Sequence, residues 1–104
     1  MTFISNAFSI NMIAGLDAAS VNFKKISAAD VPHDVVSALG HADIANVVSA
    51  DLGMTLPVNR VNNNLQKGDL MYIAQYIGPR LPEGATALPE GAKIQYYKVE
   101  VLAD

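Results

Sequence analysis

His41 is the residue best placed for chemistry in this sequence, because it follows Gly40 at the expected start of a helix. The first turn of a helix presents unpaired backbone N–H groups and the positive end of the helix dipole. This position therefore suits a bound phosphate or carboxylate, and an imidazole beside a phosphodiester can act as a general acid. The alternative interpretation is that His41 only closes a turn.

The chain has two arginines, Arg60 and Arg80, and either could bind phosphate oxygens. Arg80 lies in a Gly- and Pro-rich segment just beyond an apolar strand, where a planar, permanently charged guanidinium could grip a phosphate. The alternative for Arg80 is a surface salt bridge. Arg60 is expected to begin a strand after Pro57 and Asn59, where it either faces a cleft or lies at the edge of the sheet.

Other kinds of catalytic site have little support. Ser9 has no adjacent base and no Gly-x-Ser-x-Gly elbow, so it is expected to cap or to bind rather than to act as a nucleophile. His33 is expected to be a solvated loop residue. The two histidines form no metal-binding pair, and the absence of cysteine excludes thiolate zinc sites, iron–sulfur clusters and cysteine nucleophiles. We therefore expect metal-independent chemistry without a cofactor.

The composition restricts the domain organisation and the partners. The chain has 104 residues, of which 51% are hydrophobic and 16% charged, so we expect a single domain over residues 1–104. A net charge of −3 disfavours indiscriminate binding to DNA or to an anionic membrane. No apolar run reaches the length of a membrane span, and no signal peptide is recognisable at the N-terminus. We expect a soluble, cytoplasmic protein.

Short apolar runs separated by turn residues predict an α/β or α+β domain around one central mixed sheet with a few flanking helices. A helix is expected from just after His41 to Gly53, because apolar residues recur there at helical spacing. Gln66 to Asp69 is a connection of hairpin length, and residues 78–91 are expected to form an extended surface loop. The expected strands are Thr2 to Ile4, Ser20 to Ile26, Val35 to Leu39, Val58 to Leu65, Leu70 to Ile77 and Ile94 to Leu102.

Several short motifs occur in the order found in one family. They are Asn6-Ala7-Phe8-Ser9-Ile10-Asn11-Met12, Gly40-His41 before a helix that ends at Gly53, Asn59-Arg60-Val61, and Arg80-Leu81-x-Glu83-Gly84. The chain resembles the viral ring nucleases, which are anti-CRISPR proteins that destroy cyclic tetra-adenylate, the second messenger of type III CRISPR defence. The likeness spans almost the entire chain, and the N-terminal motif is its most specific part.

This resemblance implies a homodimer that encloses cyclic tetra-adenylate at its two-fold interface. It also implies metal-independent cleavage to linear di-adenylates that end in a 2′,3′-cyclic phosphate. In that reaction His41 would donate a proton to the departing 5′-oxygen and Arg80 would stabilise the charge of the transition state. At the matching positions of the family, Asn6, Ser9, Arg60 and Gln75 would hold phosphate, ribose or base.

The chain differs from the family pattern in three places. Ala42-Asp43 follows the histidine where an acidic residue and then Ser or Thr are expected, and the loop after Gln75 is one residue longer than usual. Residues 81–92 are short and rich in Pro and Gly where the family tends to carry a helix, so a lid built from that helix would be reduced or missing. Two alternatives therefore stay open: a non-catalytic dimer that sequesters a cyclic oligonucleotide, and a structural dimer that binds another protein.

Overall fold

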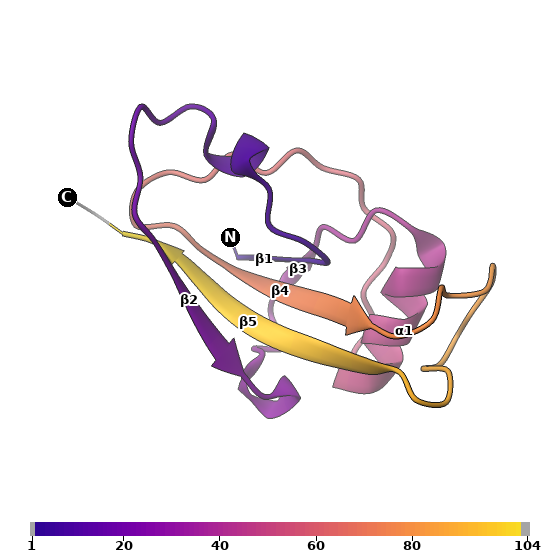
Figure 1. Cartoon of the computed structure of the whole chain (residues 1–104). Helices are drawn as coiled ribbons and strands as arrows, with labels where there is room; N and C mark the ends of the chain where they lie inside the picture. Colours follow the sequence, from indigo (N-terminus) through magenta and orange to yellow (C-terminus); the bar gives the residue numbers. More distant parts are fainter. Residues whose placement is uncertain (1, 103–104) are drawn as a thin grey trace.

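A five-stranded sheet with one α-helix against it organises the chain (Figure 1). The coordinates are a computed structural model that describes residues 2–102. In chain order the elements are β1 (Phe3–Ser5), the 3₁₀ turn η1 (Ile10–Ile13), β2 (Val21–Ile26), the 3₁₀ turn η2 (Ala28–Asp30), β3 (Val36–Ser37), α1 (Ala42–Leu52), β4 (Leu70–Ile77) and β5 (Lys93–Val101). The α+β class with a mixed sheet is therefore confirmed.

The order of the strands brings three chain segments to one edge of the sheet. The order is β2-β5-β4-β1-β3, with β1 parallel to both of its neighbours, β3 and β4. The pairs β4–β5 and β2–β5 are antiparallel. Parallel strands run toward the same edge, so the chain leaves β1, β3 and β4 in one direction, with β4 continuing to Ile77 beyond the partner of Ser5, Ile73.

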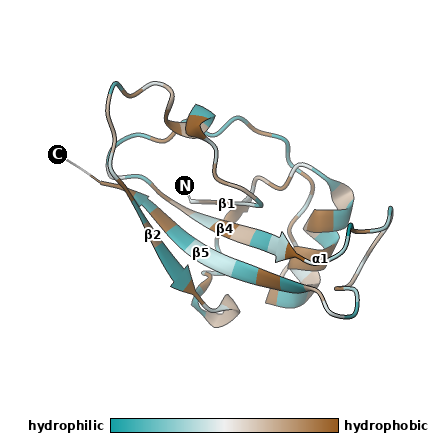
Figure 2. Ribbon diagram, viewed as in Figure 1, coloured by the Kyte–Doolittle hydropathy of each residue, from teal (hydrophilic) through white to brown (hydrophobic). Residues whose placement is uncertain are grey.

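The two faces of the sheet are covered differently. α1 packs on one face, where its apolar side meets Ile4, Tyr72 and Tyr96, and Figure 2 shows the brown residues that make up that side of the helix. The segment around η1 packs on the other face, over Met71 and Val99. The predicted helix is thus confirmed, and the buried residues of α1 are Ile44, Ala45, Val47, Val48 and Leu52.

The predicted strand from Val58 to Leu65 is wrong, and Arg60 does not begin a strand. This segment is irregular, and isolated backbone hydrogen bonds attach it to other parts of the chain. Asn59 N donates to the Leu39 carbonyl at 2.8 Å, and Leu65 N donates to the Met12 carbonyl at 2.6 Å. Asn side chains compete for backbone hydrogen bonds and have a low preference for strands, which explains why the apolar residues here do not form a ladder.

The predicted hairpin at Gln66 to Asp69 is also wrong, although the turn itself is present. The Gln66 N–H donates to the Asp69 carboxylate at 2.8 Å, and Gly68 takes a φ of 92°. The turn leads from the irregular segment into β4, whose antiparallel partner is β5. The strands β4 and β5 are joined by the predicted extended loop, which the structure confirms as irregular over residues 78–92.

No helix among residues 2–102 has both the length and the apolar character that crossing a bilayer requires.

Tyr96 joins β5 to the last turn of α1 and should contribute measurably to stability. Its hydroxyl donates to the Asp51 carboxylate at 2.6 Å, while the residue is only 3% exposed. We expect Tyr96→Phe to lower the free energy of unfolding by about 1.5 kcal/mol, the lower range for a hydrogen bond to a charged group, because Asp51 keeps contact with water. Urea denaturation measures this, with Tyr97→Phe on the opposite face as the control. An equal loss in both variants would contradict it.

The same tyrosine makes the protein sensitive to alkali. Burial raises the pKa of the Tyr96 hydroxyl far above its ordinary value, and the hydrogen bond and charge of Asp51 raise it further. A group whose pKa is raised by folding contributes stability below its unfolded value, about 10, and that contribution is lost as the pH rises above it. The free energy of unfolding should therefore fall above about pH 10, and less steeply in Tyr96→Phe. Equal slopes in both proteins would contradict this.

Candidate functional site

Three of the predicted site residues follow the three parallel strands. Asn6 comes directly after β1, His41 follows β3 through a short connection, and Arg80 comes shortly after β4. All three side chains are exposed. The sheet topology therefore brings together residues that are distant in the sequence, at the edge where parallel sheets usually bind ligands.

His41 is the N-cap residue of α1, with extended backbone angles of φ −133° and ψ 143°. Its carbonyl accepts the first hydrogen bond of the helix, from Ala45 N at 3.0 Å. The imidazole itself makes no capping hydrogen bond, and it is exposed. The ring is therefore available to other groups at the positive end of the helix, as the sequence predicts.

Arg60 contacts both the backbone of Gly40 and the side chain of His41. Its Nε donates to the Gly40 carbonyl at 2.7 Å, and its Nη2 lies 3.1 Å from Nδ1 of His41. A Cβ atom at Gly40 would approach Cγ of Arg60 to 3.3 Å, so the glycine makes room for the arginine stem. Arg60 borders a surface hollow together with His41 and does not lie on a strand.

The segment that carries Arg60 is held against the end of β3 by polar side chains, of which Ser37 had no part in the sequence prediction. The Asn59 amide donates to the Ser37 carbonyl at 2.7 Å. The Ser37 hydroxyl donates to the Pro57 carbonyl at 2.5 Å and accepts from Leu39 N at 3.2 Å. The signal available in the sequence was the asparagine directly before Arg60.

His41 lies between two surface hollows, each of which contains one of the arginines. The Arg80 hollow has a volume of about 610 Å³, and the Arg60 hollow about 500 Å³. The Arg80 hollow also includes Asp43 and Glu83, and the Arg60 hollow also includes Asn6. The imidazole can therefore reach a ligand that spans both hollows.

Asn6 connects the Arg60 hollow to a more apolar one, the aromatic hollow. This hollow contains Gln75 on β4, and the rings of Phe8 and Phe23 meet there edge to face at a centroid distance of 5.3 Å. Tyr97 lies on its wall. The structure thus brings Gln75 and Asn6 into one hollow, in a setting that suits a flat, partly apolar group such as a nucleobase.

Ser9 borders neither of the two hollows that contain His41. Its hydroxyl accepts from Asn11 N at 3.1 Å and so caps η1, which confirms the capping interpretation. Ser9 borders a hollow that contains Asn62, and Asn62 also borders the Arg60 hollow. Asn62 therefore lies between the hollow that contains Ser9 and the hollow that contains His41.

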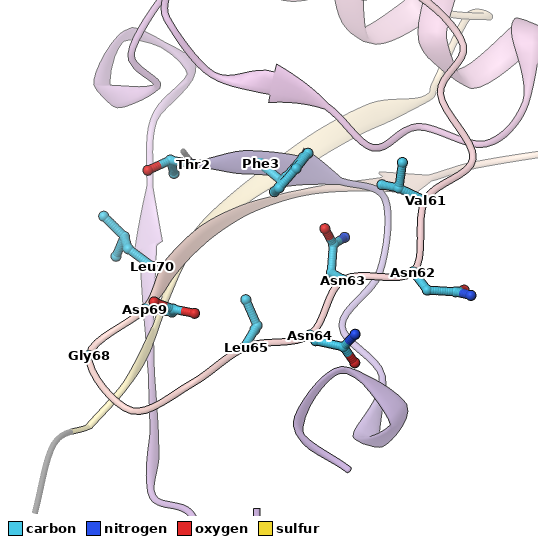
Figure 3. Close-up of a pocket in the computed structure, with 10 residues that line it drawn as sticks. All are labelled: Thr2, Phe3, Val61, Asn62, Asn63, Asn64, Leu65, Gly68, Asp69 and Leu70. Atoms are coloured by element: carbon cyan, nitrogen blue, oxygen red, sulfur yellow. The ribbon is translucent and has the colours of Figure 1, made fainter. Parts of the chain in front are cut away.

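The run Asn62-Asn63-Asn64 was missed by the sequence analysis, although three consecutive amides are an obvious polar signal. Asn63 is buried, and Figure 3 shows its side chain turned toward β1. It lines a hollow together with Thr2 and Phe3. Asn62 and Asn64 are exposed. All three asparagines line the hollow that contains Thr2 and Phe3, and Asn62 also borders the Arg60 hollow.

The loop that carries Arg80 is fixed at its base and rests on α1. The Tyr76 hydroxyl donates to the Pro79 carbonyl at 2.6 Å, and the Asn46 amide on α1 donates to the Ala85 carbonyl at 3.3 Å. The Arg80 guanidinium itself has no hydrogen bond or ion pair with any residue among 2–102. Arg80 is therefore held near His41 by its backbone, with its charged end free for a ligand.

Gly78 at the base of this loop should be intolerant of any side chain. A Cβ atom there would lie 2.7 Å from Cβ of Ala92, and at such a distance the two ends of the loop must separate. We expect Gly78→Ala to lower the free energy of unfolding by about 1–3 kcal/mol, as overpacking usually does. Chemical denaturation checks this against Gly15→Ala, where a Cβ meets nothing within 4 Å. Equal stability of the two variants would contradict it.

The site contains groups that stabilise anions and transfer protons. Two arginines, one imidazole and several amides surround the hollows. Within the part of the chain that the structure describes, no three His, Asp or Glu side chains gather into a group that could hold a metal ion. His33 is exposed and lies outside these hollows. The arrangement suits a phosphodiester whose charge is held by cations while His41 moves a proton.

Comparisons with known proteins agree with this fold over nearly the whole chain. The sequence model of the family described as STIV B116-like matches residues 2–98. Among solved structures, B116 of Sulfolobus turreted icosahedral virus is similar, with 29% sequence identity and a TM-score of 0.75. The similarity covers 95% of this chain and 97% of that protein. Among curated proteins there is no match.

Proposed function

The chain belongs to the STIV B116-like family, and on this premise we propose that it is a metal-independent phosphodiesterase that opens cyclic tetra-adenylate. The products are linear di-adenylates that end in a 2′,3′-cyclic phosphate. One observation carries the proposal: His41, at the start of α1, borders two hollows that each contain an arginine. The resemblance of the motifs to viral ring nucleases supplies the identity of the substrate.

The proposed reaction needs no nucleophile from the protein. The ribose 2′-hydroxyl attacks the neighbouring phosphorus, the bond from O2′ to phosphorus forms, and the bond from phosphorus to O5′ breaks. His41 gives a proton to O5′, and the proton of the 2′-hydroxyl passes to water. Arg80 stabilises the charge on the phosphate oxygens in the transition state, so the protein contributes positioning, charge and one proton.

A homodimer completes this site, because the hollows described above are open to solvent. A ring of four equal nucleotides has a two-fold axis, so a second copy of the chain can cover it and present each group twice. Phe23, 52% exposed at the aromatic hollow, and Ile77, 40% exposed on the same face of β4 as Gln75, offer apolar surface for the partner. Sedimentation equilibrium tests this, and a monomer in the presence of the ring would overturn it.

Cleavage itself is tested by incubating the purified protein with cyclic tri-, tetra- and hexa-adenylate in EDTA. We expect cyclic tetra-adenylate to be converted to di-adenylate with a 2′,3′-cyclic phosphate, as identified by mass. Such an activity in the cytoplasm of a host cell would remove the messenger and counter type III CRISPR immunity. Recovery of all three rings intact would overturn the proposal.

A binding protein that sequesters the ring is the second candidate, and the state of Arg80 favours it. The guanidinium of this residue is exposed and has no partner within residues 2–102, so nothing fixes it in a catalytic position before a ligand arrives. A binder would hold cyclic tetra-adenylate tightly and release it unchanged after long incubation. The mass analysis of bound and released nucleotide separates the two functions directly.

A further inference from the structure

The contact between Arg60 and His41 fixes the chemical state of the imidazole in the unliganded protein. A guanidinium is permanently charged and can only donate hydrogen bonds. Its Nη2 lies 3.1 Å from Nδ1 of His41, so Nδ1 is the acceptor and carries no hydrogen. While this hydrogen bond is made, the hydrogen of the ring lies on Nε2.

A general acid in the proposed reaction needs more than this neutral ring. A neutral imidazole that gave up its Nε2 hydrogen would become an anion, whereas an imidazolium gives up the same hydrogen and becomes neutral. His41 can become an imidazolium only when Nδ1 is free to take a proton. The guanidinium of Arg60 must therefore leave Nδ1 before the acid can act.

A phosphate can draw Arg60 away from the ring. The arginine is exposed and borders the same hollow as Asn6, where an anion has room. A charge-assisted hydrogen bond to phosphate is stronger than a bond to a neutral nitrogen acceptor, and the planar guanidinium can bind two phosphate oxygens at once. Nε, which donates to the Gly40 carbonyl at 2.7 Å, lies in the same rigid plane as Nη2. The guanidinium must therefore turn about this hydrogen bond, or give it up, when Nη2 leaves the ring.

We infer that Arg60 is a positioning residue that holds His41 in the tautomer with hydrogen on Nε2 until an anion takes over the guanidinium. Its release lets Nδ1 take one proton from water, and the imidazolium then passes its Nε2 proton to O5′. This inference rests on the proposed function for its last step only. It adds an order of events to the site: the anion binds first and the acid forms afterwards.

The other charged groups around the ring are compatible with this sequence of events. Asp43 on α1 and Glu83 on the loop after β4 border the Arg80 hollow with His41, and Arg80 faces the same space. None of these three side chains hydrogen-bonds the ring, so Arg60 is the charged residue in contact with it.

Nuclear magnetic resonance of the histidine ring nitrogens tests the inference without any nucleotide. The chain has two histidines, so exposed His33 is an internal reference in every spectrum. At about pH 9, where histidine rings are neutral, we expect His41 to show the Nε2–H form alone, whereas His33 shows a mixture of both forms. Arg60→Met keeps the stem against Gly40 but removes every donor, and it should give His41 the same mixture as His33. Arg60→Lys keeps the charge but lacks the planar guanidinium that serves two acceptors at once.

Inorganic phosphate tests the release step on the wild-type protein. Adding phosphate at constant ionic strength should move the His41 ring signals toward those of Arg60→Met and leave the His33 signals in place. A His41 that shows the same mixture of forms in wild type and Arg60→Met, or His41 signals that phosphate at 100 mM or so does not move, would overturn the inference. If the ring-nitrogen signals of His41 behave as expected in both experiments but cyclic tetra-adenylate is not cleaved, only the proposed function would be overturned.

Discussion

Replacing His41 with alanine is expected to lower the rate of ring opening about a hundredfold or more under single-turnover conditions, because a positioned general acid contributes about 10²–10⁴. The loss should be in the chemical step. The ring is exposed at the N-cap and makes no capping hydrogen bond, so its removal leaves α1 in place and frees only Nη2 of Arg60. Binding of cyclic tetra-adenylate should therefore change little, and the effect should appear in the rate of cleavage rather than in affinity.

The matched control for this variant is His33→Ala. His33 is the other histidine of the chain, is exposed, and lies outside the hollows that His41 borders. It should cleave at the wild-type rate. Radiolabelled cyclic tetra-adenylate with enzyme in excess measures both variants, and a His41→Ala protein that cleaves as fast as His33→Ala would remove the histidine from the mechanism.

The position of His41 could be predicted from the sequence because the signals are local. The apolar residues Ile44, Val48 and Leu52 repeat at helical spacing, and Gly53 ends the helix with a φ of 69° that suits glycine. These features fix where α1 begins, and the residue before it is then the N-cap. Neighbouring residues supplied the whole argument, and the folded chain agrees with it at this position.

The surroundings of His41 could not be predicted in the same way, because they depend on pairs of residues far apart in sequence. Arg60 reaches the ring because Asn59 and Ser37 fasten an irregular segment to the end of β3. The apolar residues of that segment resemble a strand locally, and the local pattern led to the wrong prediction of a strand and a hairpin. The sequence favoured no particular partner for such a segment, and only the folded chain shows which carbonyl groups it meets.

His41 shares one hollow with Asn6 and another with Arg80, and this arrangement also depends on residues that are far apart in the sequence. Each residue follows a different strand, and their proximity depends on β1 lying between β3 and β4 in parallel. Parallel pairing joins strands that are separated by long connections, and no local pattern specifies it. The motif resemblance predicts that these three residues belong to one site, a prediction that spacing alone could not make.

Arg80→Ala is the second substitution for which we expect a large loss of cleavage, about 10²–10³ in the single-turnover rate, the range for removing one charged or hydrogen-bonding group that stabilises a transition state. The side chain is exposed and has no hydrogen-bonding or ionic partner within residues 2–102, so the folded protein should not depend on it. An unchanged denaturation midpoint would verify this. The loss of rate then reflects the missing interaction between the guanidinium and the phosphate oxygens of the ligand. These oxygens are the acceptors that the guanidinium lacks in the free protein.

Two further variants separate the shape of the guanidinium from its charge. Arg80→Lys keeps the positive charge but loses the planar pair of donors, so its rate should lie between those of Arg80→Ala and wild type. Lys93→Ala removes an exposed cation at the other end of the same loop, away from the hollows that His41 borders, and should cleave normally. If Arg80→Ala cleaved within about threefold of Lys93→Ala, the arginine would act only as part of the general surface charge and would have no place beside the scissile phosphate.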